Sequence, residues 1–150
     1  MRGQISYLDS SAMAKRYLKE SGSEIIRSLY LKAYNGDAIL TFTILNIGEV
    51  IGVFDRTSYR IGDPQTYRKL KSLFLGELNR IIKLGICRIT PLNYMIIRQS
   101  CLYIEKHHIY IADAIQIASA KIVNSDAFYT GDKKLHEIAC KEGMNSIYLG

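Results

Sequence analysis

Four acidic residues in this sequence occupy positions where carboxylates could do chemistry. Asp113 and Glu49 each lie in a run that is almost wholly apolar, and Asp9 and Asp132 each follow a short run with the composition of a β-strand. An ionised carboxylate in apolar surroundings is costly unless a cation or hydrogen-bond donors compensate it. If the four side chains converge, they could share a divalent cation, and such a pocket favours hydrolysis of phosphodiester bonds.

The ligand chemistry narrows the identity of that cation. Carboxylates offer only oxygen ligands, which suit Mg²⁺ or Mn²⁺ and do not suit zinc or copper. Four carboxylates within about 5 Å would repel by about 3 kcal/mol per pair at an effective dielectric constant of about 20, so they could not all ionise without the cation. One ion would lower the pKa of an attacking water, and a second could stabilise the leaving oxygen.

Each acid also has a simpler explanation. Asp9 and Asp132 could merely cap the helices that follow them, and an acid on a helix, such as Glu49, is usually solvated. Asp113 could accept backbone N–H bonds at a helix start. The joint arrangement is what favours a site, because two acids follow strands and two lie within apolar helices of one domain.

The strands and helices that must position these acids alternate along the chain. Short apolar runs predict five strands, at residues 5–8, 38–42, 87–90, 127–130 and 146–149. Helices are expected at residues 12–20, 24–34, 44–60, 65–84, 92–106, from 110 onward and at 133–142. Ser10 or Ser11 should cap the first helix and Thr43 the third, and Gly62-Asp63-Pro64 is the clearest break.

This alternation predicts an α/β fold, a three-layer α/β/α sandwich with a five-stranded parallel sheet. The 150 residues are expected to form one domain, 1–150. Sites in such sheets form at the carboxyl ends of the strands, near the point where the strand order reverses. Asp9 and Asp132 follow the first and fourth strands, so they meet if those strands are neighbours.

The composition is typical of a folded intracellular protein. Its three cysteines are isolated, which argues against a disulfide framework and against a zinc site. The first residues lack the apolar core of a signal peptide, and the longest apolar runs are too short to span a bilayer. We therefore expect a cytoplasmic protein without membrane association.

The net charge of +6 comes from 20 basic and 14 acidic residues. With four acids gathered in one pocket, the remaining surface would be strongly positive and would suit a polyanionic partner, although a basic protein that merely needs solubility explains the charge equally well. Five basic residues flank the predicted pocket and are candidate nucleic-acid contacts: Lys15, Arg16, Lys19, Lys133 and Lys134.

Several aromatic and imidazole side chains are weaker candidates. Five tyrosines could stack on unpaired bases, although helical spacing places most of them in the core or at an interface: Tyr59, Tyr67, Tyr94, Tyr103 and Tyr110. His107 and His108 are expected in a loop because adjacent side chains cannot both face one site. His136 could approach the pocket, but a surface position is favoured.

In this order, the motifs resemble those of the PIN domain family. The resemblance rests on Asp9-Ser10-Ser11, Glu49, Ala112-Asp113-Ala114 and Thr130-Gly131-Asp132-Lys133, and it covers essentially the whole chain. In length and layout the chain is most similar to the VapC-type toxin ribonucleases of toxin–antitoxin pairs. The resemblance implies a flavodoxin-like sandwich and a Mg²⁺- or Mn²⁺-dependent endoribonuclease that dimerises and is inhibited by a small antitoxin.

By position, the resemblance implies a catalytic, metal-binding quartet of Asp9, Glu49, Asp113 and Asp132. Ser10 or Ser11, together with Thr130, would orient the carboxylates or bound water. Asp126 competes for the fourth place, but it precedes a strand and is expected at the opposite edge of the sheet.

Other functions stay open at this stage. A PIN-type nuclease could act in RNA processing without an antitoxin, and no motif separates RNA from DNA substrates. An aspartate-nucleophile phosphatase would carry a second Asp where this chain has Ser11, and the paired acids and Lys of a receiver domain are not found either. The last alternative is a non-catalytic binding domain whose acids only cap helices.

Overall fold

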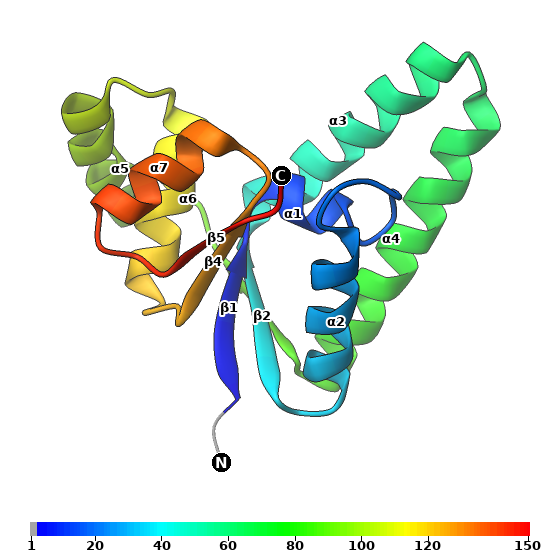
Figure 1. Ribbon diagram of the computed structural model, residues 1–150, viewed down its shortest axis with the longest axis horizontal. Coiled ribbons are helices and arrows are strands. Elements are labelled where there is room, and N and C mark those ends of the chain that lie inside the picture. The colour runs from blue at the N-terminus through cyan, green and yellow to red at the C-terminus, as the bar shows by residue number, and fades with distance from the viewer. Residues whose placement is uncertain (1–2) are drawn as a thin grey trace.

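A parallel β-sheet forms the centre of the protein, for which a computed structural model describes residues 3–150 (Figure 1). Its strands are β1 (Gln4–Leu8), β2 (Ala38–Thr43), β3 (Cys87–Thr90), β4 (Ala127–Thr130) and β5 (Ser146–Tyr148). Their order is β3-β2-β1-β4-β5, and every neighbouring pair is parallel. The predicted five-stranded parallel sheet is therefore confirmed.

Helices cover both faces of this sheet, so the predicted three-layer α/β/α sandwich is also confirmed (Figure 1). One layer contains α1 (Ser10–Ala14), α2 (Ser23–Tyr34), α3 (Ile44–Ile61) and α4 (Pro64–Leu84). The other contains α5 (Tyr94–His107), α6 (Ile111–Ile122) and α7 (Lys133–Lys141). Figure 1 shows α3 and α4 as a long helical hairpin that extends beyond the sheet.

The central strand explains why the sheet is apolar on both faces. Tyr7 and Leu8 of β1 are fully buried and point to opposite sides, as neighbouring residues of a strand must. Tyr7 stacks on Phe128 of β4, with ring centroids 5.5 Å apart, in the core beneath α6 and α7. Leu8 packs in the larger core beneath α1 to α4. A strand covered by helices on both faces has no polar side to alternate with.

The break predicted between the two longest helices is confirmed. Gly62 ends α3 with a φ of 77°, a left-handed conformation that glycine adopts without strain. Asp63 then caps α4 by accepting a hydrogen bond from the Gln65 N–H at 3.0 Å, and Pro64 is the first residue of that helix.

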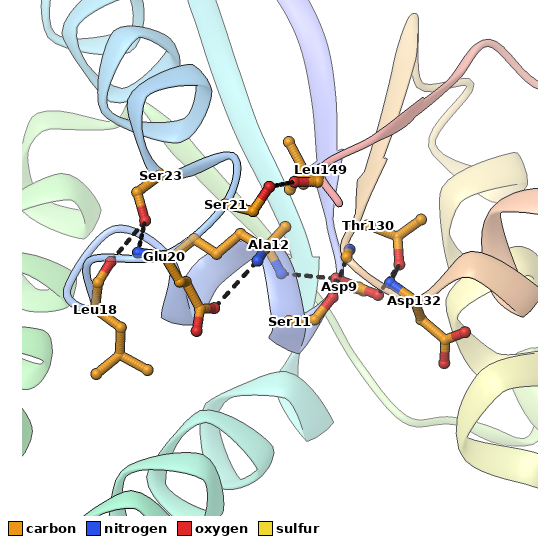
Figure 2. Close-up of polar contacts among 12 residues, drawn as sticks. Asp9, Ser11, Ala12, Leu18, Glu20, Ser21, Ser23, Thr130, Asp132 and Leu149 are labelled. Atoms are coloured by element: carbon orange, nitrogen blue, oxygen red, sulfur yellow. Dashed lines mark hydrogen bonds and ion pairs between the residues drawn. The ribbon is translucent and has the colours of Figure 1, made fainter.

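The first helix is much shorter than predicted. A helix was expected over residues 12–20, but α1 ends at Ala14. Beyond it the chain turns so that Arg16 and Tyr17 both donate hydrogen bonds to Glu77 of α4. Ser23 holds the end of this turn, because its hydroxyl donates to the Leu18 carbonyl at 2.7 Å (Figure 2). Contacts distant in sequence therefore override a helical pattern.

Of the two predicted caps, the one at Ser10 or Ser11 was wrong and the one at Thr43 is confirmed in position. Asp9, and neither Ser10 nor Ser11, caps α1. Thr43 does occupy the N-cap position of α3, but its hydroxyl donates to the Thr90 carbonyl at 3.4 Å instead of capping the helix. The remaining elements begin and end within about two residues of their predicted bounds. Across residues 3–150, no helix combines the length and apolar character needed to cross a membrane.

Candidate active site

The carboxyl ends of β1 and β4 meet at the centre of the sheet. The two strands pair directly, with Leu8 opposite Tyr129. The sheet continues from β1 through β2 to β3 on one side, and through β4 to β5 on the other. The strand order therefore reverses between β1 and β4, where sheets of this kind form their sites. Asp9 follows β1 and Asp132 follows β4, so both lie at this switch point as the strand pattern predicted.

Asp9 is 5% exposed, and both of its carboxylate oxygens accept hydrogen bonds (Figure 2). Oδ1 accepts from the Ser11 hydroxyl at 2.6 Å and from the Ala12 N–H at 2.8 Å. Oδ2 accepts from the Thr130 hydroxyl at 2.5 Å. These donors hold the carboxylate in one orientation, so Asp9 is both a helix cap and a preorganised acid.

Thr130 links Asp9 to Asp132. Its hydroxyl donates to Asp9 and accepts from the Asp132 backbone N–H at 3.0 Å. The Gly131 N–H donates to the Ser11 hydroxyl at 2.8 Å. Two hydroxyls thus tie the turn after β1 to the turn after β4, which keeps the two acidic segments together (Figure 2).

Helices supply the other two predicted acids. Glu49 lies in the second turn of α3 and Asp113 in the first turn of α6, and both are partly buried. Asp132 is exposed, and its Oδ1 accepts from the Leu135 N–H at 3.1 Å, which caps α7. The simpler explanation of Asp132 as a helix cap is therefore also correct, as it is for Asp9, and neither cap prevents a second role.

Charge interactions link the four acids to one another. The pKa of Asp9 is raised to about 6, chiefly by burial and to a smaller extent by the charge of Asp132, although the hydrogen bonds to Asp9 act in the opposite direction. Burial raises the pKa of Glu49, and the charges of Asp9 and Asp113 act in the same sense. Burial also raises the pKa of Asp113, and the charge of Asp132 adds to it. Each acid therefore lies within electrostatic reach of two others.

The donor set fits a hard divalent cation. It consists of carboxylates alone, and a cation among them would offset both the burial of these negative charges and their mutual repulsion. Within residues 3–150, however, no three Asp, Glu, His or Cys side chains lie close enough together to form a ready-made metal site. The tight cluster expected from the sequence is thus not preformed, and metal binding by the four acids stays a prediction.

The predicted hydroxyl residues serve two different acids. Ser11 and Thr130 donate to Asp9. Burial raises the pKa of Glu49 overall, but a hydrogen bond from Ser10 opposes that change. The sequence left Ser10 and Ser11 as alternatives; in the structure the hydrogen bond to Asp9 comes from Ser11.

A buried chain of hydrogen bonds connects the elements that carry these acids. The Tyr7 hydroxyl donates to Gln116 Oε1 at 2.7 Å, and the Gln116 amide donates to Asn46 Oδ1 at 2.7 Å. The Asn46 amide then donates to the Leu8 carbonyl at 3.0 Å. We call this Tyr7–Gln116–Asn46 chain the buried relay, and its three side chains are at most 3% exposed. It joins β1, α3 and α6.

The buried relay was missed at the level of sequence. Asn46 lies three residues before Glu49, and Gln116 lies three residues after Asp113, so each amide is one helical turn from an acid. That shared spacing, a polar residue one turn from an acid in an otherwise apolar helix, is the signal that could have indicated the pair.

The five predicted nucleic-acid contacts divide into two groups. Lys15 is 5% exposed and pairs with Glu20 at 3.1 Å. Arg16 pairs with Glu77 through Nε at 2.9 Å and Nη2 at 3.0 Å. Both charges are thus paired with carboxylates of the protein, which weakens their prediction as phosphate contacts. The other three residues are exposed: Lys19, Lys133 and Lys134.

The minor candidates lie elsewhere. Asp126 accepts a hydrogen bond from the Ile5 N–H near the start of β1, which confirms its predicted place at the opposite end of the sheet from Asp9. His107 is the last residue of α5 and contacts Glu142 at 2.7 Å, so its predicted loop position was wrong. His136 is partly exposed on α7.

Comparison with known proteins supplies a family. A model of the family described as PIN domain matches residues 6–141, a span that contains all four acids. By sequence, no curated protein matches the chain.

Solved structures with a similar fold include three bacterial proteins. Mycobacterium tuberculosis VapC20, described as a sarcin-ricin loop cleaving toxin, is 12% identical with a TM-score of 0.62, covering 87% of this chain and 92% of its own. Rickettsia felis VapBC2 bound to a promoter DNA fragment is 14% identical with a TM-score of 0.60, and the match covers 98% of this chain and 100% of the other. Neisseria gonorrhoeae FitAcB is 16% identical with a TM-score of 0.59, and the match covers 95% of this chain and 96% of the other. Identities this low indicate a shared fold and no more.

Proposed function

Because the chain belongs to the PIN domain family, we propose that it is an endoribonuclease that hydrolyses RNA phosphodiester bonds with Mg²⁺ or Mn²⁺ as cofactor. The observation that carries the proposal is that four acids from four separate segments lie near enough for their charges to affect one another around the switch point of the sheet. Helix capping accounts for Asp9 and Asp132, but it gives no reason for Glu49 and Asp113 to lie within electrostatic reach of them. The family favours a nuclease over the phosphatase and receiver alternatives.

In this proposal the four acids would hold the metal: Asp9, Glu49, Asp113 and Asp132. When bound, such an ion lowers the pKa of an attacking water and offsets charge on the leaving oxygen. The protein contributes preorganisation, because Ser11 and Thr130 fix the Asp9 carboxylate before any substrate arrives. The exposed Lys133 and Lys134, next to Asp132 in the chain, would attract the phosphate backbone.

We further propose that the enzyme is the toxin of a type II toxin–antitoxin pair and has a small antitoxin as partner. The similarity in fold to VapC20, VapBC2 and FitAcB supports this assignment. A homodimer is also proposed, since α5 exposes four large hydrophobic side chains that a second copy could cover: Tyr94, Met95, Ile97 and Leu102. A PIN nuclease that processes RNA without an antitoxin is the alternative.

Cleavage of single-stranded RNA by the purified chain tests the enzymatic proposal. Activity should require Mg²⁺ or Mn²⁺, disappear in chelator and be lost in Asp113→Asn, because the amide cannot replace the negative charge. Glu137→Gln removes an exposed acid on α7 and serves as the matched control, which should stay active. Single-stranded DNA of the same sequence is the second substrate. Full activity of a folded Asp113→Asn variant would rule out the proposed site.

A further inference from the structure

A small cavity opens beside Asp113, where the turn between α5 and α6 faces the first turn of α7. Its volume is about 320 Å³, and its lining residues are His108, Ile109, Tyr110, Asp113 and Lys134. Small-molecule sites begin at roughly 300 Å³, so the cavity is large enough for one small ligand. Since Asp113 is also one of the four proposed metal-binding acids, a ligand in the cavity would lie directly beside the proposed active site.

Tyr110 gives the cavity an aromatic wall. Its side chain is 87% exposed, whereas the neighbouring Ile109 is 7% exposed and anchors the turn in the core. An aromatic ring with this exposure contributes little to packing and presents a π face that a nucleobase can stack on. Tyr59 is equally exposed but lies on α3 and does not line this cavity. What distinguishes Tyr110 is therefore that it lines a cavity that Asp113 also lines.

The cavity is lined by one acidic and one basic side chain, those of Asp113 and Lys134. Lys134 is exposed in the first turn of α7, and its charge lowers the pKa of Asp113, although burial raises it overall. His108 adopts a left-handed φ of 55° at the end of α5, which turns the chain so that its exposed side chain lines the same hollow. An anionic group would settle toward Lys134 and away from Asp113.

We infer that this cavity binds one unpaired nucleotide of the RNA substrate, with its base against Tyr110 and its phosphate toward Lys134. The inference rests on the proposed function, which makes RNA the substrate. A base must leave its duplex to stack on a protein ring, so the pocket would select single-stranded or looped RNA next to the cleaved bond. Asp113 can accept a hydrogen bond from an amino group of the base or from a ribose hydroxyl.

Binding of ribonucleoside 5′-monophosphates to the full chain tests the inference separately from catalysis, because these ligands contain no diester bond to cleave. Each of the four nucleotides, and inorganic phosphate alone, would be titrated in millimolar Mg²⁺ and followed by calorimetry or by amide shifts. At least one nucleotide should bind more tightly than inorganic phosphate. Tyr110→Ala should lower the affinity for that nucleotide by about 5- to 100-fold, whereas Tyr110→Phe keeps the ring and should retain the affinity.

Tyr59→Ala is the matched control, because it removes an equally exposed ring outside the cavity and should leave the affinity unchanged. With RNA as substrate, Tyr110→Ala should raise KM and leave kcat nearly unchanged. Nucleotides that bind no better than phosphate, or an unaltered affinity in Tyr110→Ala, would overturn the inference. So would a change of oligomeric state without a change in affinity, because the ring would then belong to a subunit interface. If the wild-type chain binds nucleotides but cleaves no RNA, the proposed nuclease function is refuted and the nucleotide-binding role of the cavity stands.

Discussion

The Gln116 side-chain amide donates to Asn46 Oδ1 across 2.7 Å and so joins α6 to α3 inside the core. Each of these amides lies one helical turn from a proposed metal-binding acid. Both side chains are almost completely buried, so water cannot replace a partner that is removed. The bond therefore links, within the core, the helix that carries Glu49 to the helix that carries Asp113.

The first prediction concerns this bond. Gln116→Met keeps the approximate shape of the side chain but leaves the Tyr7 hydroxyl and Asn46 Oδ1 without their partner. We expect a loss of about 1–3 kcal/mol in the free energy of unfolding, measured by urea denaturation. Asn46→Leu should cost a similar amount. The double variant should cost less than the sum, because it removes both ends of one bond, and strict additivity would show that the two amides are not coupled.

Thr130 is the subject of the second prediction, because its one hydroxyl serves both strand-end acids. Thr130→Val preserves the shape of the side chain but removes the donor to Asp9 and the acceptor for the Asp132 N–H. RNA cleavage should fall, and the free energy of unfolding should drop by about 1–3 kcal/mol. Thr130→Ser restores the hydroxyl and should recover most of both losses. A fully active valine variant would show that the orientation of Asp9 does not matter.

The third prediction uses the repulsion among the acids. Without divalent metal, Asp113→Asn should raise the melting temperature, since it removes a charge that faces Glu49 and Asp132. With millimolar Mg²⁺ or Mn²⁺ the wild type should gain stability, by about 2.7 kcal/mol when the metal exceeds its dissociation constant 100-fold, and the variant should gain less. The variant should therefore have the higher melting temperature without metal, and the wild type should have the higher melting temperature with metal. Equal responses would mean that the acids do not bind metal together.

The parts of this structure that follow from sequence are the ones set by local pattern. The strand that ends at Thr130 was predicted to the residue because a short apolar run is bounded by a polar residue before it and Gly131 after it. The meeting of Asp9 and Asp132 followed from the rule that parallel sheets place their sites at strand ends.

What could not be predicted depends on partners far away in the chain. Tyr17 ends in a hydrogen bond to Glu77, 60 residues later, and no helical pattern over residues 12–20 contains that information. The bond between Asn46 and Gln116 spans 70 residues. Its two ends can be recognised as candidates from their spacing, but their pairing is decided by how α3 and α6 pack.

The fourth prediction concerns how the stability of the fold depends on pH through Glu142, which lies outside the proposed site. Burial alone would raise the pKa of Glu142, but Lys106, Lys121 and His107 outweigh it and hold the pKa at about 2, against an ordinary value of 4.5. Because the folded-state pKa is lowered, the stabilisation is fully present above about pH 4.5 and is lost as the pH falls toward 2.

Glu142→Gln should therefore cost about 1–2 kcal/mol at neutral pH, a modest amount because Lys106 is largely exposed. Urea denaturation at neutral pH and at about pH 3 should show the gap between wild type and variant closing as the solution becomes more acidic. Glu105→Gln, an exposed acid of α5, should show no such gap. A gap that widens in acid would contradict the assigned direction of the pKa shift.

The final prediction separates cations that hold the fold from cations that would hold RNA. Arg16 donates two hydrogen bonds to Glu77, which is 7% exposed, and its guanidinium also lies 4.9 Å from the centre of the Tyr30 ring. Arg16→Ala would leave a buried carboxylate without its cation and should cost about 2–3 kcal/mol of stability. Lys19→Ala and Lys133→Ala remove exposed charges and should change stability by less than about 0.5 kcal/mol.

RNA binding should show the opposite ranking. Measured in the Asp113→Asn background so that RNA is not cleaved, the logarithm of affinity should fall with the logarithm of salt concentration. Each lysine that contacts a phosphate contributes about 0.7 to that slope on single strands, so Lys19→Ala and Lys133→Ala should each flatten it by about that amount. Arg16→Ala should leave the slope unchanged, because its charge is already neutralised by Glu77. A flattened slope in folded Arg16→Ala would return this residue to the nucleic-acid contacts predicted from sequence.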